Sequence, residues 1–76
     1  MTLATISDVI VSTPSSSEFN CEVILSNNKT VNVNLFHTEG TVSPEETVVE
    51  LSGPMSYEDF RTAMFAVTEA WNTREV

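Results

Sequence analysis

The 76-residue sequence predicts a small α+β domain, an antiparallel sheet of three to four strands with one C-terminal helix packed across one face. Two patterns predict this class. Apolar and polar residues alternate in the first part of the chain, whereas apolar residues recur at helical spacing after Ser56. A chain of this length forms a single domain, residues 1–76, and buries roughly 60% of its unfolded surface. A small core must therefore provide nearly all of its stability.

The first predicted strand covers residues 3–12, which are β-branched and apolar but alternate too imperfectly to fix the inward face. A polar connection follows at residues 12–17. Strict alternation then predicts two half-buried strands. Their core-facing residues are Phe19, Cys21, Val23 and Leu25 in one strand and Val31, Val33 and Leu35 in the other.

The length of the turn between these two strands is predicted from which residues it would pair on the core face of the sheet. A two-residue loop would place Val23 opposite Asn32, an apolar residue against a polar one. A three-residue loop at residues 26–28 places Val23 opposite Val31 instead. This loop requires a left-handed backbone conformation at Asn28, and asparagine tolerates that conformation better than most residues.

Residues 43–53 fit two structures. Residues 43–46 would start a helix well, with a capping serine, a proline in the first turn and acids near the positive end of the dipole, and Gly53 would end it. Residues 47–51 are short and β-branched, which favours a fourth strand. We expect the strand and retain the helix as the alternative.

The C-terminal helix is predicted from the capping residues 56–59 and from one apolar stripe. The stripe consists of Phe60, Ala63, Met64, Val67, Ala70 and Trp71. We expect Met64 and Trp71 to be buried against Val23, Val31 and Val33 of the sheet. Phe65 falls well outside the stripe, on an acidic face of the helix, where an exposed ring would suit an apolar partner.

Charge gives the strongest indication of function. Eleven acids and three bases give a formal net charge of −8, and no Lys or Arg lies between Lys29 and Arg61. A protein so charged repels phosphate, so we expect no direct binding to nucleic acid and attraction to a basic protein partner. Alternate side chains on one face of a strand repeat at about 6.6 to 6.8 Å, and rows of carboxylates at such spacings can stand in for backbone phosphates.

The sheet face away from the helix is a second candidate surface. It is polar enough for solvent, holds two apolar side chains, and could pair with a partner or with its own copy. Its predicted residues are Asn20, Glu22, Ile24, Thr30, Asn32, Asn34 and Phe36.

No group of residues indicates catalysis, a cofactor or a metal. Cys21 is expected to be a small core hydrophobe, and His37 with Glu39 supplies too few ligands for zinc. The adjacent acids at 45–46 and 58–59 are explained by helix dipoles and solubility. We expect no enzyme, with no catalytic residues.

The expected location is the cytoplasm. The first residues lack the basic region and long apolar core of a secretion signal, and no later run is long enough to span a bilayer, so we expect no membrane association. Cys21 is the only cysteine, which excludes an internal disulfide and agrees with a reducing compartment.

These observations predict a small acidic binding protein without enzymatic activity, an inhibitor that occupies a basic, nucleic-acid-binding surface of another protein. By analogy alone, phage-encoded anti-defence or host-takeover proteins fit this description, and they act in the host cytoplasm. The predicted protein-binding residues are Glu39, Glu45, Glu46, Glu50, Glu58, Asp59, Phe65 and Glu69.

Two alternatives remain open. An antitoxin or immunity-type partner would share nearly all these features, and like the inhibitor it would be a monomer or homodimer. A small structural or assembly subunit would instead self-associate through the sheet face or the helix, and it would form larger assemblies.

Overall fold

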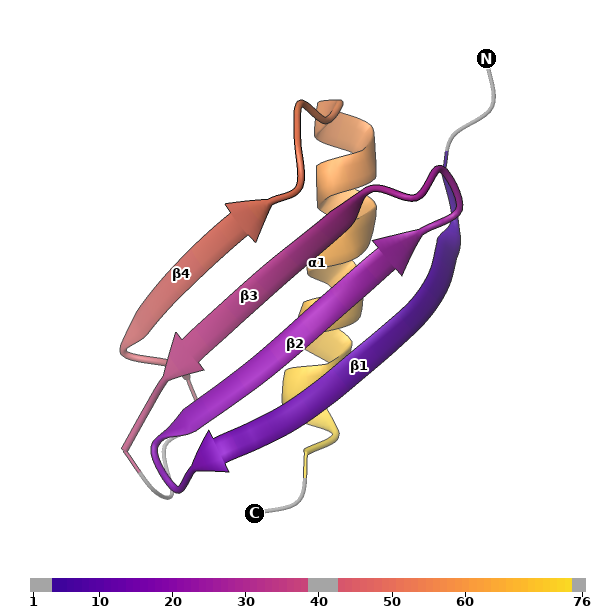
Figure 1. The fold of residues 1–76 in the computed structure, drawn as a ribbon. Helices are drawn as coiled ribbons and strands as arrows, with labels where there is room; N and C mark the ends of the chain where they lie inside the picture. Colours follow the sequence, from indigo (N-terminus) through magenta and orange to yellow (C-terminus); the bar gives the residue numbers. More distant parts are fainter. Residues whose placement is uncertain (1–3, 39–42, 75–76) are drawn as a thin grey trace.

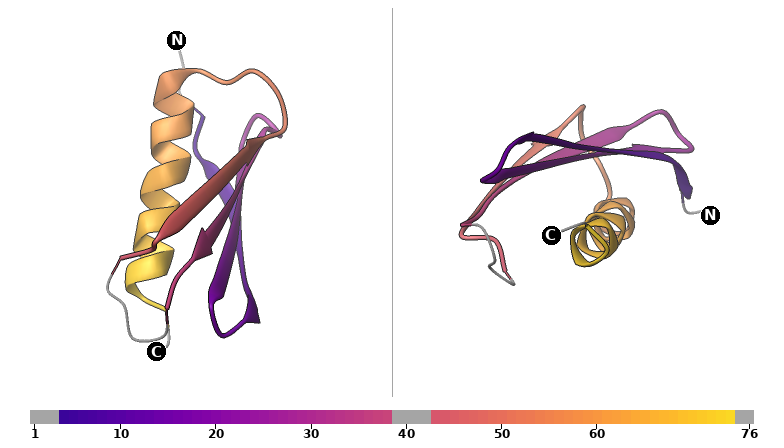
Figure 2. Two further views of the ribbon diagram at one scale, coloured as in Figure 1. Left: turned by 90° about the vertical axis from the view of Figure 1, so that its left-hand side faces the viewer. Right: turned by 90° about the horizontal axis from the view of Figure 1, so that it is seen from below.

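The computed structural model of the chain describes residues 4–38 and 43–74, in which four strands precede one helix (Figure 1). These elements are β1 (Ile6–Ser15), β2 (Glu18–Leu25), β3 (Thr30–Phe36), β4 (Glu46–Leu51) and α1 (Tyr57–Asn72). The strands form one antiparallel sheet in the order β1-β2-β3-β4. The helix forms a second layer against one face of this sheet (Figure 2). The predicted α+β fold is therefore confirmed.

The core lies between α1 and the two central strands. Alternate residues of β2 and β3 are fully buried, as their sequence pattern predicts. From the helix, Ala63, Val67 and Trp71 are buried. The expected burial of Met64 was wrong, because this residue lies at the margin of the stripe and is only half-buried. The helix lies mainly over β2, with fewer contacts to β1 and β3. Within the described residues, the helix makes no such contact with β4, so the β4 edge extends beyond it.

The hairpin between β2 and β3 has the predicted register. Val23 pairs with Val31, and the same register pairs Cys21 with Val33 and Phe19 with Leu35. The Leu25 N–H donates to the Lys29 carbonyl oxygen at 2.9 Å, which closes the three-residue loop. Asn28 adopts a φ of 66°, the left-handed conformation that this loop requires.

The bounds predicted for the first strand and its connection were wrong. The strand begins at Ile6 and runs to Ser15, so the connection is reduced to residues 16–17. The register shift between Ser12 and Ser15 lets the polar end of β1 stay paired with β2, and Pro14 is tolerated because β1 is an edge strand. Val9 pairs with Val23 and therefore faces the helix side. Residue 3 lies outside the described residues.

Residues 46–51 form a strand, as expected, and the helical alternative for residues 43–53 is excluded. The Glu45 N–H donates to the Phe36 carbonyl oxygen at 2.8 Å, which brings the chain into the sheet. All six residues of β4 are exposed on both faces. Helix α1 begins where predicted, because the Ser56 hydroxyl accepts the Asp59 N–H at 3.2 Å.

Candidate protein-binding face

The sheet face turned away from α1, here called the outer face, carries a group of carboxylates. Residues paired across an antiparallel sheet share a face, so the registers show which acids lie together. Four of them come from β2 and β4, and we call them the carboxylate quartet: Glu18, Glu22, Glu46 and Glu50. Asp8 of β1 lies on the same face, opposite Ile24.

The carboxylate quartet has a regular geometry that follows from the register. Phe36 of β3 pairs with one quartet residue on each side, and so does Asn32. The two strands of the quartet are thus separated by one strand, which places paired Cα atoms about 9.5 Å apart. Within each strand the acids are four residues apart, which is about 13 Å. The acids lie at the corners of a rectangle, at about twice the along-strand spacing that the sequence suggested.

The middle of the rectangle is amide-rich and partly unpaired. Asn34 pairs with Asn20 on one side and Val48 on the other. The Asn20 Nδ2 donates to the Asn32 Oδ1 at 2.9 Å, which ties the two central strands together. Among the described residues, the buried Asn34 Oδ1 has no hydrogen-bond partner. This oxygen is itself buried, so it is not presented to a partner that lies on the face.

Apolar side chains interrupt the acidic face. Ile10 lies opposite Glu22 and is 47% exposed, and Val48 of β4 is 41% exposed. Phe36 is half-buried between two acids of the quartet. The face therefore offers both charge and apolar contact area. Protein–protein interfaces typically combine an apolar centre with a polar rim.

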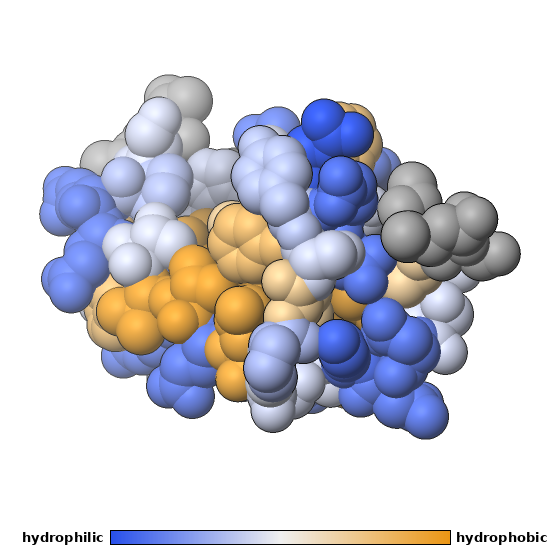
Figure 3. Space-filling view, turned by 90° about the horizontal axis from the view of Figure 1, so that it is seen from above, coloured by the Kyte–Doolittle hydropathy of each residue, from blue (hydrophilic) through white to orange (hydrophobic). Residues whose placement is uncertain are grey.

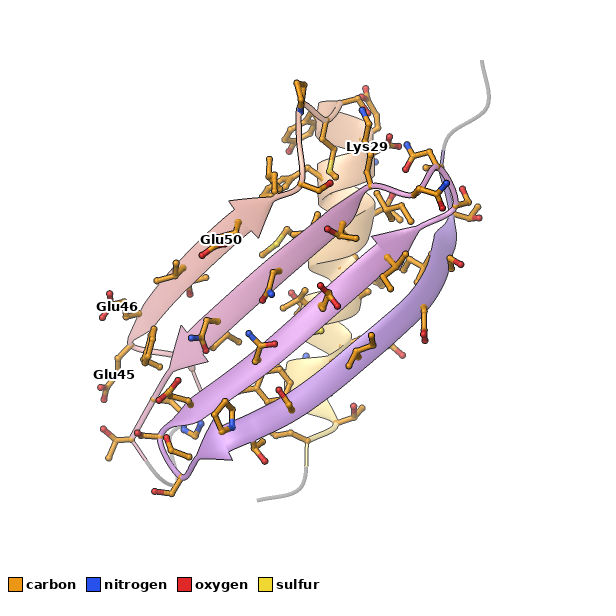
Figure 4. The ribbon with its side chains drawn as sticks, in the orientation of Figure 1. Lys29, Glu45, Glu46 and Glu50 are labelled. Atoms are coloured by element: carbon orange, nitrogen blue, oxygen red, sulfur yellow. The ribbon has the colours of Figure 1, made fainter. Side chains whose placement is uncertain are left out.

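The bases of the chain lie away from the strand positions of this face. The Lys29 Nζ donates to the Pro54 carbonyl oxygen at 2.6 Å, at the end of the sheet remote from Glu46 (Figure 4). Arg61 lies on α1, and the Arg74 guanidinium lies over the Trp71 ring at 3.4 Å from its centroid. The quartet therefore has no cation within its own strands to offset its field.

The predicted binding residues from the middle of the chain are partly brought together. Glu46 and Glu50 follow one another along β4 and belong to the quartet (Figure 4). Glu45 precedes the strand, and its Oε1 accepts a hydrogen bond from the Thr38 hydroxyl at 2.9 Å. Glu39 lies outside the described residues.

The remaining predicted residues lie on the opposite side of the molecule. Glu58, Phe65 and Glu69 belong to α1, which is behind the sheet when the outer face is viewed (Figure 4). Phe65 is 73% exposed, as its position outside the stripe predicts. Asp59 has a structural role, since its carboxylate accepts hydrogen bonds from the Ala4 N–H and the Asn27 Nδ2, both at 3.3 Å. One partner surface cannot contact both groups at once.

Three outer-face acids were absent from the predicted set: Asp8, Glu18 and Glu22. Alternation did place Glu22 on the face away from the helix. Its grouping with the acids of β4 depends on the register between β3 and β4, for which the sequence carries no comparable signal. A one-residue shift in that register would turn Glu46 and Glu50 to the helix side.

The rest of the described structure offers little chemistry. Cys21 is fully buried, and burial raises the pKa of its thiol above the ordinary value of 9.0. The described residues hold no group of three or more His, Cys, Asp or Glu side chains that could bind a metal ion. Across the same residues, no helix has the length and apolar character needed to cross a bilayer.

Comparison with known proteins gives no match: no family model, no curated protein and no solved structure matches this chain.

Proposed function

We propose that this chain is a small, non-enzymatic binding protein whose outer face occupies a basic surface of another protein, in the manner of an inhibitor of a nucleic-acid-binding protein. The observation that carries the proposal is the carboxylate quartet, four acids at the corners of a rectangle of about 9.5 by 13 Å. A field of one sign on one face attracts a basic surface and speeds encounter with it.

One further feature supports a binding role for this face. Ile10 and Val48 supply exposed apolar area beside the acids, which a purely solubilising face does not need. The free, buried Cys21 fits a reducing compartment, so a cytoplasmic location is part of the proposal.

An antitoxin or immunity-type protein would use the same face in the same way, because such a protein also neutralises a basic partner. The two roles differ in the partner and not in the geometry. Self-assembly through the outer face is disfavoured, since it would bring two quartets of equal sign together. Phage origin and action against host defence remain proposals that rest on analogy alone.

Affinity capture with matched variants tests the proposal. The protein is immobilised and exposed to a nuclease-treated lysate of its source cell, and bound proteins are quantified by mass spectrometry. Glu22→Gln/Glu50→Gln removes two charges from the outer face, and Glu58→Gln/Glu69→Gln removes two from the helix side. Both variants change the net charge equally, so any difference between them reports the face that binds.

The expected result is a basic protein that is retained by the wild type and the helix-side variant but lost with the outer-face variant. Added duplex DNA should displace it, because the quartet and the nucleic acid would compete for one basic surface. Equal loss with both variants would mean that net charge alone attracts the partner, and loss with the helix-side variant only would overturn the proposal.

A further inference from the structure

The two edges of the sheet differ in how accessible their backbone is. The edge strand β1 has register shifts near both ends and contains Pro14. The Asp8 Oδ1 also accepts the Val9 N–H at 2.8 Å, and this N–H points away from β2. Bulges, proline and charged side chains are devices by which edge strands avoid pairing with another chain. The β1 edge is therefore protected near both of its ends and at the Val9 N–H.

Of these devices, β4 carries within its described length only charged side chains, Glu46 and Glu50. It pairs with β3 without a register shift and contains no proline. The Ser52 N–H donates to the Thr30 carbonyl oxygen at 3.1 Å, and backbone groups alternate in direction along an antiparallel strand. The residues of β4 whose N–H and C=O groups point to the free edge are therefore Thr47, Val49 and Leu51.

The same three residues have side chains on the helix side, where α1 does not cover them. Val49 is 37% exposed and Leu51 is 46% exposed. Beside them, a groove of about 390 Å³ lies between the sheet and the helix, lined in part by Thr47, Met64 and Trp71. Figure 3 shows apolar side chains gathered on this side, between β4 and α1. An added strand could extend this apolar surface.

The outer side of β4 has the opposite chemistry. Glu46 and Glu50 flank Val48 there, and both acids belong to the carboxylate quartet. A strand added to β4 would place alternate side chains directly opposite these acids, within about 5.5 Å between Cβ atoms. Opposite charges stabilise such cross-strand pairs, and like charges destabilise them.

We propose that β4 accepts an extended segment of the partner protein as an additional strand of the sheet. This inference rests on the proposed function and specifies the partner segment. Basic side chains would lie opposite Glu46 and Glu50, and apolar side chains would lie opposite Thr47, Val49 and Leu51. Across the six residues of β4, an antiparallel segment would read apolar, basic, apolar, any residue, apolar, basic.

A second copy of the chain fits the edge less well than a basic segment. Each copy carries a net charge of −8. In the register that pairs Val48 with the same residue of a second copy, Glu46 of each chain would lie opposite Glu50 of the other. Like charges directly opposite one another destabilise strand pairing.

A synthetic peptide tests the inference on the full-length protein. The probe is Val-Lys-Val-Thr-Val-Lys with blocked ends, used at about 1 mM to detect weak binding. Two controls have the sequences Val-Lys-Lys-Thr-Val-Val, which keeps the composition but breaks the alternation, and Val-Glu-Val-Thr-Val-Glu, which reverses the charge. Amide hydrogen exchange followed by NMR reports which N–H groups the peptide covers.

The expected result is slower exchange of the Thr47, Val49 and Leu51 amides with the alternating lysine peptide. The amides of Val48 and Glu50 should change little, because they already point toward β3. Neither control peptide should protect the three edge amides. This every-second-residue pattern would distinguish strand addition from general attraction to the acidic face.

A pair of proline variants gives an independent test. Val49→Pro removes an N–H at the β4 free edge and leaves the bonds to β3 in place. Val11→Pro makes the same change at the β1 free edge. The first variant should weaken peptide binding on the order of tenfold, the effect of losing a backbone hydrogen bond and its neighbours. The second should not weaken it. If Val49→Pro does not fold, the exchange pattern of the wild type decides.

Four results would overturn the inference: no protection of the edge amides, equal protection by the scrambled peptide, protection at β1 instead, or protection that rises with protein concentration without peptide. The last result would identify a second copy as the occupant. If the edge amides stay unprotected while capture still depends on Glu22 and Glu50, the inference fails but the proposed function stands. If capture does not depend on those acids, the proposed function itself fails.

Discussion

The indole of Trp71 meets the ring of Phe19 edge-on, with ring centroids 5.4 Å apart and an interplanar angle of 87°. The His37 ring contacts the same indole, with centroids 4.9 Å apart. Through these contacts, the C-terminal end of α1 packs against β2 and against the residue that follows β3. The helix is therefore anchored over the centre of the sheet, which leaves β4 uncovered.

Trp71→Ala should lower the free energy of unfolding by about 3–5 kcal/mol, because the indole is buried and its loss leaves a cavity. Phe65→Ala, on the exposed side of the same helix, should change it by less than about 0.5 kcal/mol. Urea unfolding followed by circular dichroism measures both. Similar effects of the two substitutions would contradict the observed orientation of α1.

The β2–β3 turn gives a test of backbone conformation. Asn28 has a φ of 66°, where a β-branched residue is strained and glycine is not. Asn28→Val should lower the free energy of unfolding by about 1–2 kcal/mol. Asn28→Gly should leave it unchanged or raise it slightly. Thermal melting of both variants checks the three-residue loop, and equal stability of the two would be inconsistent with it.

Stability at alkaline pH should depend on Cys21. Burial raises the pKa of its thiol above 9.0, so the folded protein holds this proton more tightly than the unfolded chain does. The stabilisation is complete below pH 9.0 and is lost as pH rises toward the folded-state pKa, by up to about 1.4 kcal/mol per pH unit.

The Cys21→Ala variant lacks this titration and provides the control. Denaturant unfolding of both proteins across the alkaline range should show the wild type losing stability relative to the variant. A constant difference between them at every pH would mean that the thiol is not desolvated in the folded protein.

The isolated protein should not bind DNA or RNA. With three bases against eleven acids, it cannot release enough counterions to offset the repulsion between its field and the phosphates. Gel retardation with duplex and single-stranded probes at about 150 mM salt checks this expectation. A shifted band would contradict the view that the acidic surface attracts proteins and repels nucleic acid.

The parts of the fold that the sequence predicted well are local ones. Strict alternation predicted the β2–β3 hairpin, its register and the left-handed Asn28. These features depend on residues that are close together in the sequence. The helical periodicity of 100° per residue likewise placed Phe65 outside the buried stripe of α1, because this pattern also depends on neighbouring residues. Local patterns were sufficient for these features.

The parts that the sequence did not predict depend on longer-range geometry. The register shifts of β1 leave no clear alternation from which to read its inward face. The position of α1 over β2 is set by packing, and it decides that β4 is exposed on both faces. The carboxylate quartet joins acids of β2 to acids of β4 across β3, so no single segment of sequence displays it.

The central claim is that the outer face, and not net charge alone, recognises a basic partner. Surface plasmon resonance with the captured partner tests it most directly, with association rates measured across a salt series for the wild type, Glu22→Gln/Glu50→Gln and Glu58→Gln/Glu69→Gln. At low salt, the outer-face variant should associate about tenfold more slowly than the wild type, and the difference should shrink as the Debye length falls to about 3 Å at 1 M. The helix-side variant should associate nearly as fast as the wild type. Equal slowing of both variants, or rates that do not respond to salt, would contradict the claim.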